Sequence, residues 1–167
     1  MPKASSWQGS WQRRSIFYLV TALVIAVDQL SKLWVRSSLS IGELLPEEGR
    51  FQLTYVANKG AVFGFSVPWV LPLIFSVLVI VAACFLYYKY PLFHGLLAKI
   101  ALGLIFGGAA GNLIDRAHLG YVVDFIYIRL WRDYHWPAFN LADTAIVVGA
   151  ILLAYFLIYS MKPLKHS

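Results

Sequence analysis

The chain of 167 residues is 60% hydrophobic and 13% charged, with a formal net charge of +6. Soluble proteins carry roughly 25% charged residues, so this composition excludes a water-soluble protein and predicts an integral membrane protein of one domain. The basic residues are spread over tails and loops, which argues against nucleic-acid binding and favours roles in orientation and lipid headgroup contact. The single cysteine, Cys84, lies in an apolar run and provides no disulfide framework.

Four apolar stretches are long enough to cross about 30 Å of hydrocarbon as helices. We expect these spans at residues 16–35, 68–88, 96–113 and 141–161. A polar tail, 1–15, precedes the first span, and a short tail, 162–167, follows the last. A basic start before an apolar run is also typical of a signal peptide, but the first span is too long for one and lacks a small-residue cleavage site.

Two extramembrane segments, 36–67 and 114–140, connect these spans. Residues 51–55 alternate between apolar and polar side chains as a half-exposed strand does, and residues 121–131 are rich in β-branched and aromatic residues. The predicted fold class is therefore an all-α integral membrane protein with four transmembrane helices and a small amount of strand. In the third span, small residues recur at intervals of four and predict close approach of another helix: Gly103, Gly107 and Gly111.

Four spans place both termini on one side of the membrane and both long loops on the other. The unusual polar residues of the spans then converge on the loop side: Asp28, Lys32, Asn112, Asp115, Arg116, Asn140 and Asp143. Counting Lys and Arg barely decides which side is cytoplasmic, although the basic tails favour cytoplasmic termini.

The stretch from Val123 to Asp143 has a carboxylate near each end, Asp124 and Asp143. A carboxylate near lipid is usually functional, and two that meet share one proton, so that one activates water while the other donates to a carbonyl. This pattern predicts an aspartyl protease site. The simpler interpretation of Asp143 is an acid that stabilises a helix N-terminus, and that of Asp124 is an acid paired with an arginine at a strand edge.

Three further side chains are candidates for supporting such a site. Asn112 and Arg116 share a helix face, and Arg116 could hold a carboxylate, bind a lipid phosphate or extend to the interface. Asn140 could orient Asp143 or cap the fourth helix. Asp28 and Lys32 are spaced four apart and predict a buried ion pair.

Other chemistries fit the sequence poorly. The four histidines lack the spacing of a zinc protease, and there is no nucleophile elbow or phosphate-binding glycine loop. Two non-protease alternatives remain. A transporter predicts acids spread through the membrane's depth, whereas a lipid-binding or assembly module would leave Asp124 and Asp143 far apart.

Five blocks, in order, resemble those of the lipoprotein signal peptidases, the type II signal peptidases of bacteria: Asp28–Lys32 (DQLSK), Asn58–Phe63 (NKGAVF), Gly111–Arg116 (GNLIDR), Val123–Phe125 (VDF) and Phe139–Asp143 (FNLAD). The resemblance covers about residues 16–161. Each block alone is a weak signal, but five in order are specific. The sequence departs from the family pattern at Ser31 and Val62, neither of which is a catalytic position.

The resemblance implies a membrane aspartyl endopeptidase that cuts diacylglyceryl-modified prolipoproteins just before the lipidated cysteine and is the target of globomycin. It implies Asp124 and Asp143 as the catalytic dyad. The residues that it assigns to support of the site, the substrate or the wall are Asn58, Gly60, Asn112, Arg116, Asn140, Asp28 and Lys32. No metal or cofactor is implied.

The resemblance also implies a location and an arrangement in the membrane. We expect a monomer in the bacterial inner membrane, in contact with phospholipid and with lipid-modified precursors, and with both termini cytoplasmic. A small β-sheet cradle and the active site are then expected at the outer face.

Overall fold

The computed structural model describes residues 5–62, 65–68, 70–131 and 134–160. It contains four helices that are long and apolar enough to cross a membrane: α1 (Ser5–Ser38), α2 (Val70–Lys89), α3 (Leu96–Leu119) and α4 (Leu141–Ser160). A short 3₁₀ helix, η1 (Pro91–His94), connects α2 to α3. The prediction of four helical spans is confirmed.

Two helices extend further than predicted. α1 begins at Ser5, so most of the expected polar tail is helical, although its apolar span starts at Ser15. α3 continues six residues past the predicted end at 113, because the helix ends only where Gly120 adopts a left-handed conformation (φ 75°) and donates its N–H to Arg116 O. Residues 1–4 and 162–167 of the predicted tails, and Phe63 of the second block, lie outside the described residues.

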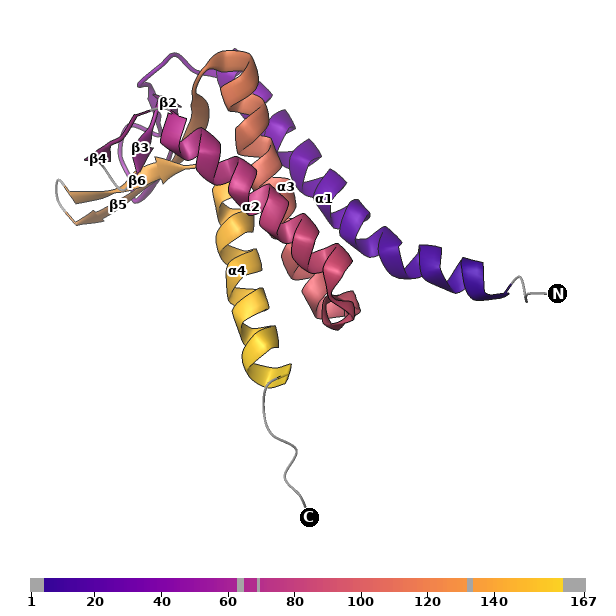
Figure 1. Cartoon of the computed structure of the whole chain (residues 1–167). Helices are drawn as coiled ribbons and strands as arrows, with labels where there is room; N and C mark the ends of the chain where they lie inside the picture. Colours follow the sequence, from indigo (N-terminus) through magenta and orange to yellow (C-terminus); the bar gives the residue numbers. More distant parts are fainter. Residues whose placement is uncertain (1–4, 63–64, 69, 132–133, 161–167) are drawn as a thin grey trace.

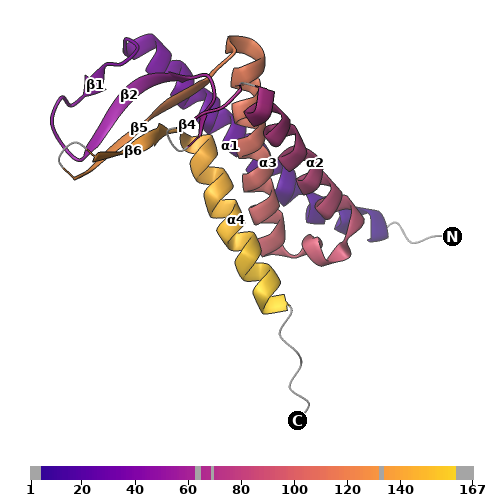
Figure 2. The same ribbon diagram turned by 60° about the vertical axis from the view of Figure 1, so that its left-hand side comes forward.

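A four-stranded antiparallel sheet lies beside the end of the helix bundle where α1 and α3 end and α2 and α4 begin (Figures 1 and 2). Its order is β1 (Leu44–Leu45), β2 (Phe51–Asn58), β5 (Val122–Trp131) and β6 (Tyr134–Phe139). The predicted strands at 51–55 and 121–131 are therefore confirmed.

The segment after β2 forms a second, two-stranded sheet. Its strands are β3 (Ala61–Val62) and β4 (Phe65–Ser66), which pair antiparallel with each other. The chain then enters α2.

α3 is the most buried helix and packs against each of the other three. Its stripe of Gly103, Gly107 and Gly111 lies against α1, where an added methyl group at Gly107 would meet Val24 at 2.8 Å. Gly149 of α4 likewise allows α4 to pack closely against another face of α3. The predicted close approach of a helix to the glycine stripe is confirmed.

An apolar cluster joins the sheet to the helix bundle. Val35 and Leu39, at the end of α1, pack against Tyr55 of β2 and against Val123 and Phe125 of β5. Because Val123 and Phe125 point into this cluster, the residue between them points to the opposite face of the strand. That residue is Asp124.

We predict that Gly149→Leu destabilises the protein whereas Ala150→Leu does not. A Cβ at Gly149 would lie 2.7 Å from Ala101 O, so α3 and α4 must separate, while Ala150 is exposed on the outside of α4. Overpacking of this kind costs about 1–3 kcal/mol. Thermal unfolding of the detergent-solubilised variants measures the difference, and an equal melting temperature for both would contradict the packing described for this helix pair.

Candidate functional site

Asp124 is a buried acid of β5 whose partners are amides. Its side chain is 3% exposed. Oδ2 accepts a hydrogen bond of 2.8 Å from Asn58 Nδ2, and Oδ1 accepts one of 2.7 Å from Asn140 Nδ2. The alternative of a strand-edge acid paired with an arginine is wrong, because the side chain is buried and its partners are uncharged.

Asn58 is oriented by the turn that follows β2. Its Oδ1 accepts a hydrogen bond of 3.0 Å from the Gly60 N–H, and Gly60 has a φ of 145°, which favours glycine. With its oxygen held by the turn, the amide presents its nitrogen to Asp124. The turn at residues 58–60 therefore positions a site side chain.

Asp143 and Asn140 form a reciprocal cap at the start of α4. Asn140 Oδ1 accepts from the Asp143 N–H at 2.9 Å, and Asp143 Oδ2 accepts from the Asn140 N–H at 3.2 Å. This is the capping-box arrangement, so the two interpretations of Asn140 hold together: it caps the helix and contacts both Asp124 and Asp143.

Asn112 connects α3 to this cap. Its Nδ2 donates to Asp143 Oδ1 at 2.7 Å. Its Oδ1 accepts from Asn140 Nδ2 and from Lys32 Nζ, both at 3.1 Å. One carboxamide therefore links the helix cap to the buried ammonium group of α1.

The carboxyl groups of Asp124 and Asp143 are coupled electrostatically. Burial, and then repulsion from the Asp143 carboxylate, raises the pKa of Asp124 from its ordinary 3.8 to about 7. Hydrogen bonds from Asn58 and Asn140, and the charge of Lys32, lower this pKa but do not outweigh the burial. The pair can thus hold one proton near neutral pH.

Lys32 forms buried ion pairs with two carboxylates. Its ammonium group lies 2.8 Å from Asp28 Oδ2 and 3.0 Å from Asp115 Oδ2, and all three side chains are at most 3% exposed. Gln29 Nε2 adds a hydrogen bond of 2.9 Å to Asp115 Oδ1. The predicted pair of Asp28 and Lys32 is confirmed, and Asp115 extends it to α3.

Each of these two carboxylates also binds the backbone N–H that precedes one acid of the site. Asp28 Oδ1 accepts from Ala142 N at 3.0 Å, one residue before Asp143. Asp115 Oδ2 accepts from Val123 N at 3.0 Å, one residue before Asp124. The ion-pair cluster therefore fixes the backbone at both acids.

Arg116 binds neutral groups rather than a carboxylate. Its Nη1 donates to Ser76 Oγ at 3.1 Å and to Asn112 O at 3.3 Å, which ties α3 to α2. Its charge also acts on Asp143 and Asp124 at longer range. The guanidinium group thus adds positive potential to the site without a direct ion pair in this conformation.

The structure gathers the predicted residues at one place and adds others. Asn58, Asn112, Asn140, Asp124 and Asp143 contact one another, Gly60 binds Asn58, and Asp28 and Lys32 lie directly behind them. Sequence reasoning missed the roles of Gln29, Ser76 and Asp115. The role of Asp115 could have been found from the sequence, because it is a third acid near the end of an apolar span. No feature of the sequence distinguishes Ser76 within its apolar helix.

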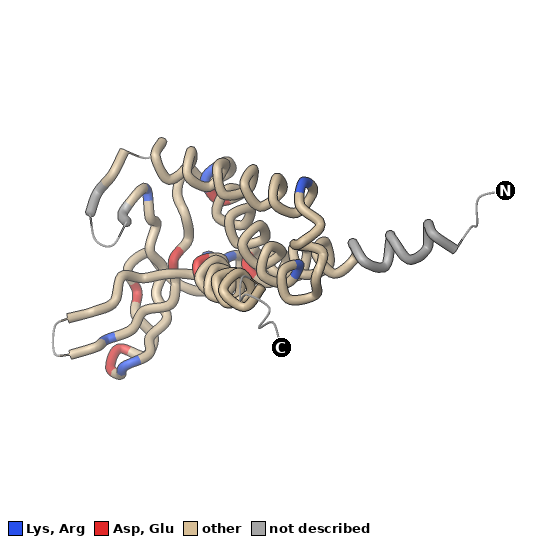
Figure 3. The backbone as a smooth tube through the Cα atoms, turned by 60° about the horizontal axis from the view of Figure 1, so that its bottom comes forward, with Lys and Arg blue, Asp and Glu red and all other residues tan. Residues whose placement is uncertain are grey.

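The positions of the acids also weigh on the two non-protease alternatives. Figure 3 shows the described acidic residues in the part of the molecule that contains the sheet and the helix segments next to it. Asp28, ten residues before the end of α1, lies within its helix rather than at its end. A transporter pathway predicts acids spread through the whole depth of the membrane instead. The shared contact of Asp124 and Asp143 with Asn140 likewise disagrees with the simple assembly module.

Comparison with known proteins identifies the family. The family model described as "Signal peptidase (SPase) II" matches residues 20–159. The lipoprotein signal peptidase of Geobacter metallireducens is 43% identical over 143 residues, covering 83% of this chain and 88% of that protein. That of Syntrophus aciditrophicus is 42% identical over 156 residues, covering 88% and 95%.

Solved structures agree with this assignment. A bacterial membrane enzyme determined in meso at 2.3 Å resolution has a TM-score of 0.78 and 28% identity, with coverage of 90% of this chain and 93% of that one. A second, determined at 1.9 Å resolution, has a TM-score of 0.72 at the same identity. The chain therefore belongs to the signal peptidase II family, which is a family of peptidases.

Proposed function

We propose that this protein is a membrane aspartyl endopeptidase that removes the signal peptide from diacylglyceryl-modified bacterial prolipoproteins, cutting just before the lipidated cysteine. The observation that carries the mechanism is that Asp124 and Asp143 contact the same residue, Asn140, while the pKa of Asp124 is about 7. The substrate class rests on the relatives, which are named lipoprotein signal peptidases.

In the proposed reaction Asp124 carries the shared proton and Asp143 is ionised. The Asp143 carboxylate takes a proton from a water molecule as its oxygen attacks the scissile carbonyl carbon, and Asp124 donates its proton to the carbonyl oxygen. When the tetrahedral intermediate collapses, the proton on Asp143 passes to the leaving amine and Asp124 recovers its own. This step uses only two carboxyl groups and water, and the family resemblance likewise implies no metal or cofactor.

The hydrogen bonds at the two acids support this division of roles. The Asp143 carboxylate accepts hydrogen bonds from the Asn112 side-chain amide and from the Asn140 N–H, and both bonds stabilise its ionised form. Asp124 is buried, which favours its neutral form. The proton nevertheless belongs to the coupled pair, and titration reports on both acids together.

We place the site at the outer face of the bacterial inner membrane, with cytoplasmic termini and a monomeric enzyme. A substrate with two acyl chains beside its scissile bond remains at the bilayer surface, and the candidate site lies at the end of the helix bundle rather than in its middle. Asn58, Gly60, Asn112, Arg116 and Asn140 would support the site and substrate there. Asp28 and Lys32 would form its wall.

The proposal is tested with the variants Asp124→Asn and Asp143→Asn. We expect each to lower cleavage of a diacylglyceryl-modified precursor by about 10²–10⁴-fold, the contribution of a general acid or base, without loss of membrane insertion. Glu47→Gln, an exposed acid of the loop before β2, is the control and should keep the globomycin-sensitive activity of the wild type. Wild-type rates in either aspartate variant would contradict the dyad.

Activity should fall as the pH rises through about 7. Asp124 has a raised pKa, so it is protonated below that pH and ionises above it, where the general acid is lost. Asn58→Ala removes a hydrogen bond that lowers this pKa, so the alkaline limb of the kcat/KM profile should move to higher pH. A profile that is flat from pH 6 to 9, or a limb that moves to lower pH in the variant, argues against Asp124 as the acid.

Lys32→Met should both destabilise the protein and slow cleavage. It leaves two buried carboxylates without their cation, and removal of one partner of a buried pair costs about 3–5 kcal/mol. We expect a lower melting temperature and, in the folded fraction, a rate at least tenfold lower, because Ala142 and Val123 lose their fixed anchors. Lys89→Met, at the exposed end of α2, is the control. A Lys32→Met enzyme with the stability and rate of that control would show that the ion pairs do not hold the site.

A further inference from the structure

A cleft of about 670 Å³ lies between α1 and α3, near the ends of both helices. It is lined by residues of both helices and of β5: Gln29, Leu30, Lys32, Leu33, Arg36, Ile114, Asp115, His118, Leu119 and Val123. The two helices pack tightly along the glycine stripe as far as Gly111. Beyond that point the side chains on the same side of α3, from Ile114 to His118, are large, and the cleft begins there.

The rim of the cleft is basic. Arg36 and His118 are both exposed and lie within two residues of the ends of the apolar spans, which is the level of lipid headgroups. Among the described residues, the carboxylates that line the cleft or lie behind it are engaged by Lys32, and none forms an ion pair with Arg36. Arg36 donates a hydrogen bond to the hydroxyl of Tyr55, which is neutral and leaves the guanidinium charge uncompensated. The guanidinium charge is therefore available to an anion.

The part of the cleft deeper in the membrane is apolar. Leu33 and Leu30 precede Arg36 by three and six residues, so they lie about 4.5 and 9 Å further along the helix axis. Their side chains are 58% and 65% exposed, and Ile114 faces them from α3. Charge at the headgroup level above an apolar surface at the acyl level matches a phospholipid better than a free anion.

This cleft is separate from the candidate active site. Lys32 and Asp115 form its inner wall, and they are at most 3% exposed because they pair with each other. Val123 of β5 lines the cleft, so Asp124, the next residue of the strand, points to the opposite face, where Asn58 of β2 contacts it. A ligand in the cleft would thus lie behind the ion-pair cluster rather than among the acids.

We propose that the cleft between α1 and α3 binds an anionic phospholipid of the leaflet next to the sheet. The phosphate contacts Arg36 at the rim, with His118 beside it, and an acyl chain lies over Leu30 and Leu33. An arginine near a membrane surface is worth about 1 kcal/mol to an anionic lipid, which corresponds to about a fivefold change in affinity.

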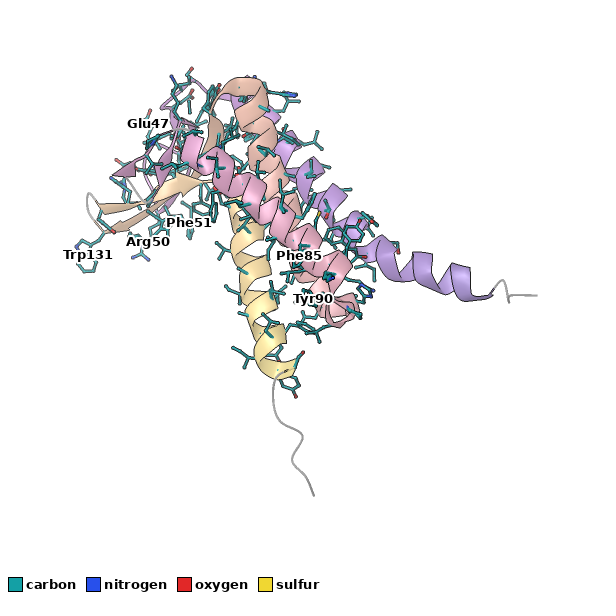
Figure 4. All side chains as sticks on the ribbon, viewed as in Figure 1. Glu47, Arg50, Phe51, Phe85, Tyr90 and Trp131 are labelled. Atoms are coloured by element: carbon teal, nitrogen blue, oxygen red, sulfur yellow. The ribbon has the colours of Figure 1, made fainter. Side chains whose placement is uncertain are left out.

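Native mass spectrometry of the full-length enzyme in neutral detergent tests this proposal with phosphatidylglycerol, phosphatidylcholine and glycerol phosphate as probes. We expect preferential retention of phosphatidylglycerol, a dissociation constant about fivefold higher in Arg36→Gln, and glycerol phosphate binding at least tenfold weaker than the lipid. Arg50→Gln is the matched control, because Arg50 is an exposed arginine that immediately precedes β2, away from the cleft (Figure 4).

Three results would each overturn the proposal. Equal retention of phosphatidylcholine would remove the role of charge. An equal loss in Arg36→Gln and Arg50→Gln would mean diffuse attraction rather than a site. Glycerol phosphate that displaces the lipid at the same concentration would mean that the leucines take no part. None of these variants changes a residue assigned to catalysis, so the lipid measurement is independent of the cleavage assay.

Discussion

The arrangement of the site depends on one ammonium group buried between two carboxylates. Lys32 of α1 holds Asp28 of its own helix and Asp115 of α3, and these acids in turn bind the backbone N–H groups before Asp143 and Asp124. The Lys32 ammonium group therefore holds the backbone at both acids of the site, through Asp28 for Asp143 and through Asp115 for Asp124. Its desolvation is tolerated because each carboxylate is also hydrogen-bonded, the condition under which buried charges are stable.

A network of amides completes this arrangement and brings α3 and α4 together at the site. Asn112 contacts Lys32 with its oxygen and Asp143 with its nitrogen, while Asn140 contacts Asp124 and caps α4. Carboxamides suit this position because they donate and accept without adding charge. Because the amides add no charge beside the acids, burial of Asp124 and its repulsion from the Asp143 carboxylate determine which acid holds the shared proton.

The fold was largely predictable from the sequence, and the acids of the site partly so. Hydropathy located the four spans because the bilayer imposes their length, and spacing predicted both the pair of Asp28 and Lys32 and the cap at Asn140. The end of α3 was misjudged because Asp115 and Arg116 lower the hydropathy of its last residues, although Asp115 is buried and paired with Lys32. The pairing of Asp115 with Lys32 and the contact of Arg116 with Ser76 could not be predicted, since these partners come from other helices and no local spacing specifies them.

The glycine stripe explains why a charged cluster of this kind can exist beside lipid at all. An added methyl group at Gly111 would lie 2.5 Å from Asp28 Oδ2, so only glycine allows α1 to bring this carboxylate against α3, within reach of the Lys32 ammonium and the Ala142 N–H. Close backbone approach is also what lets Gln29 bond to Gly111 O and Asp115. In a membrane, where an unsatisfied polar group costs several kcal/mol, small residues are thus as necessary to the site as its acids, because they determine whether every buried charge finds its partner.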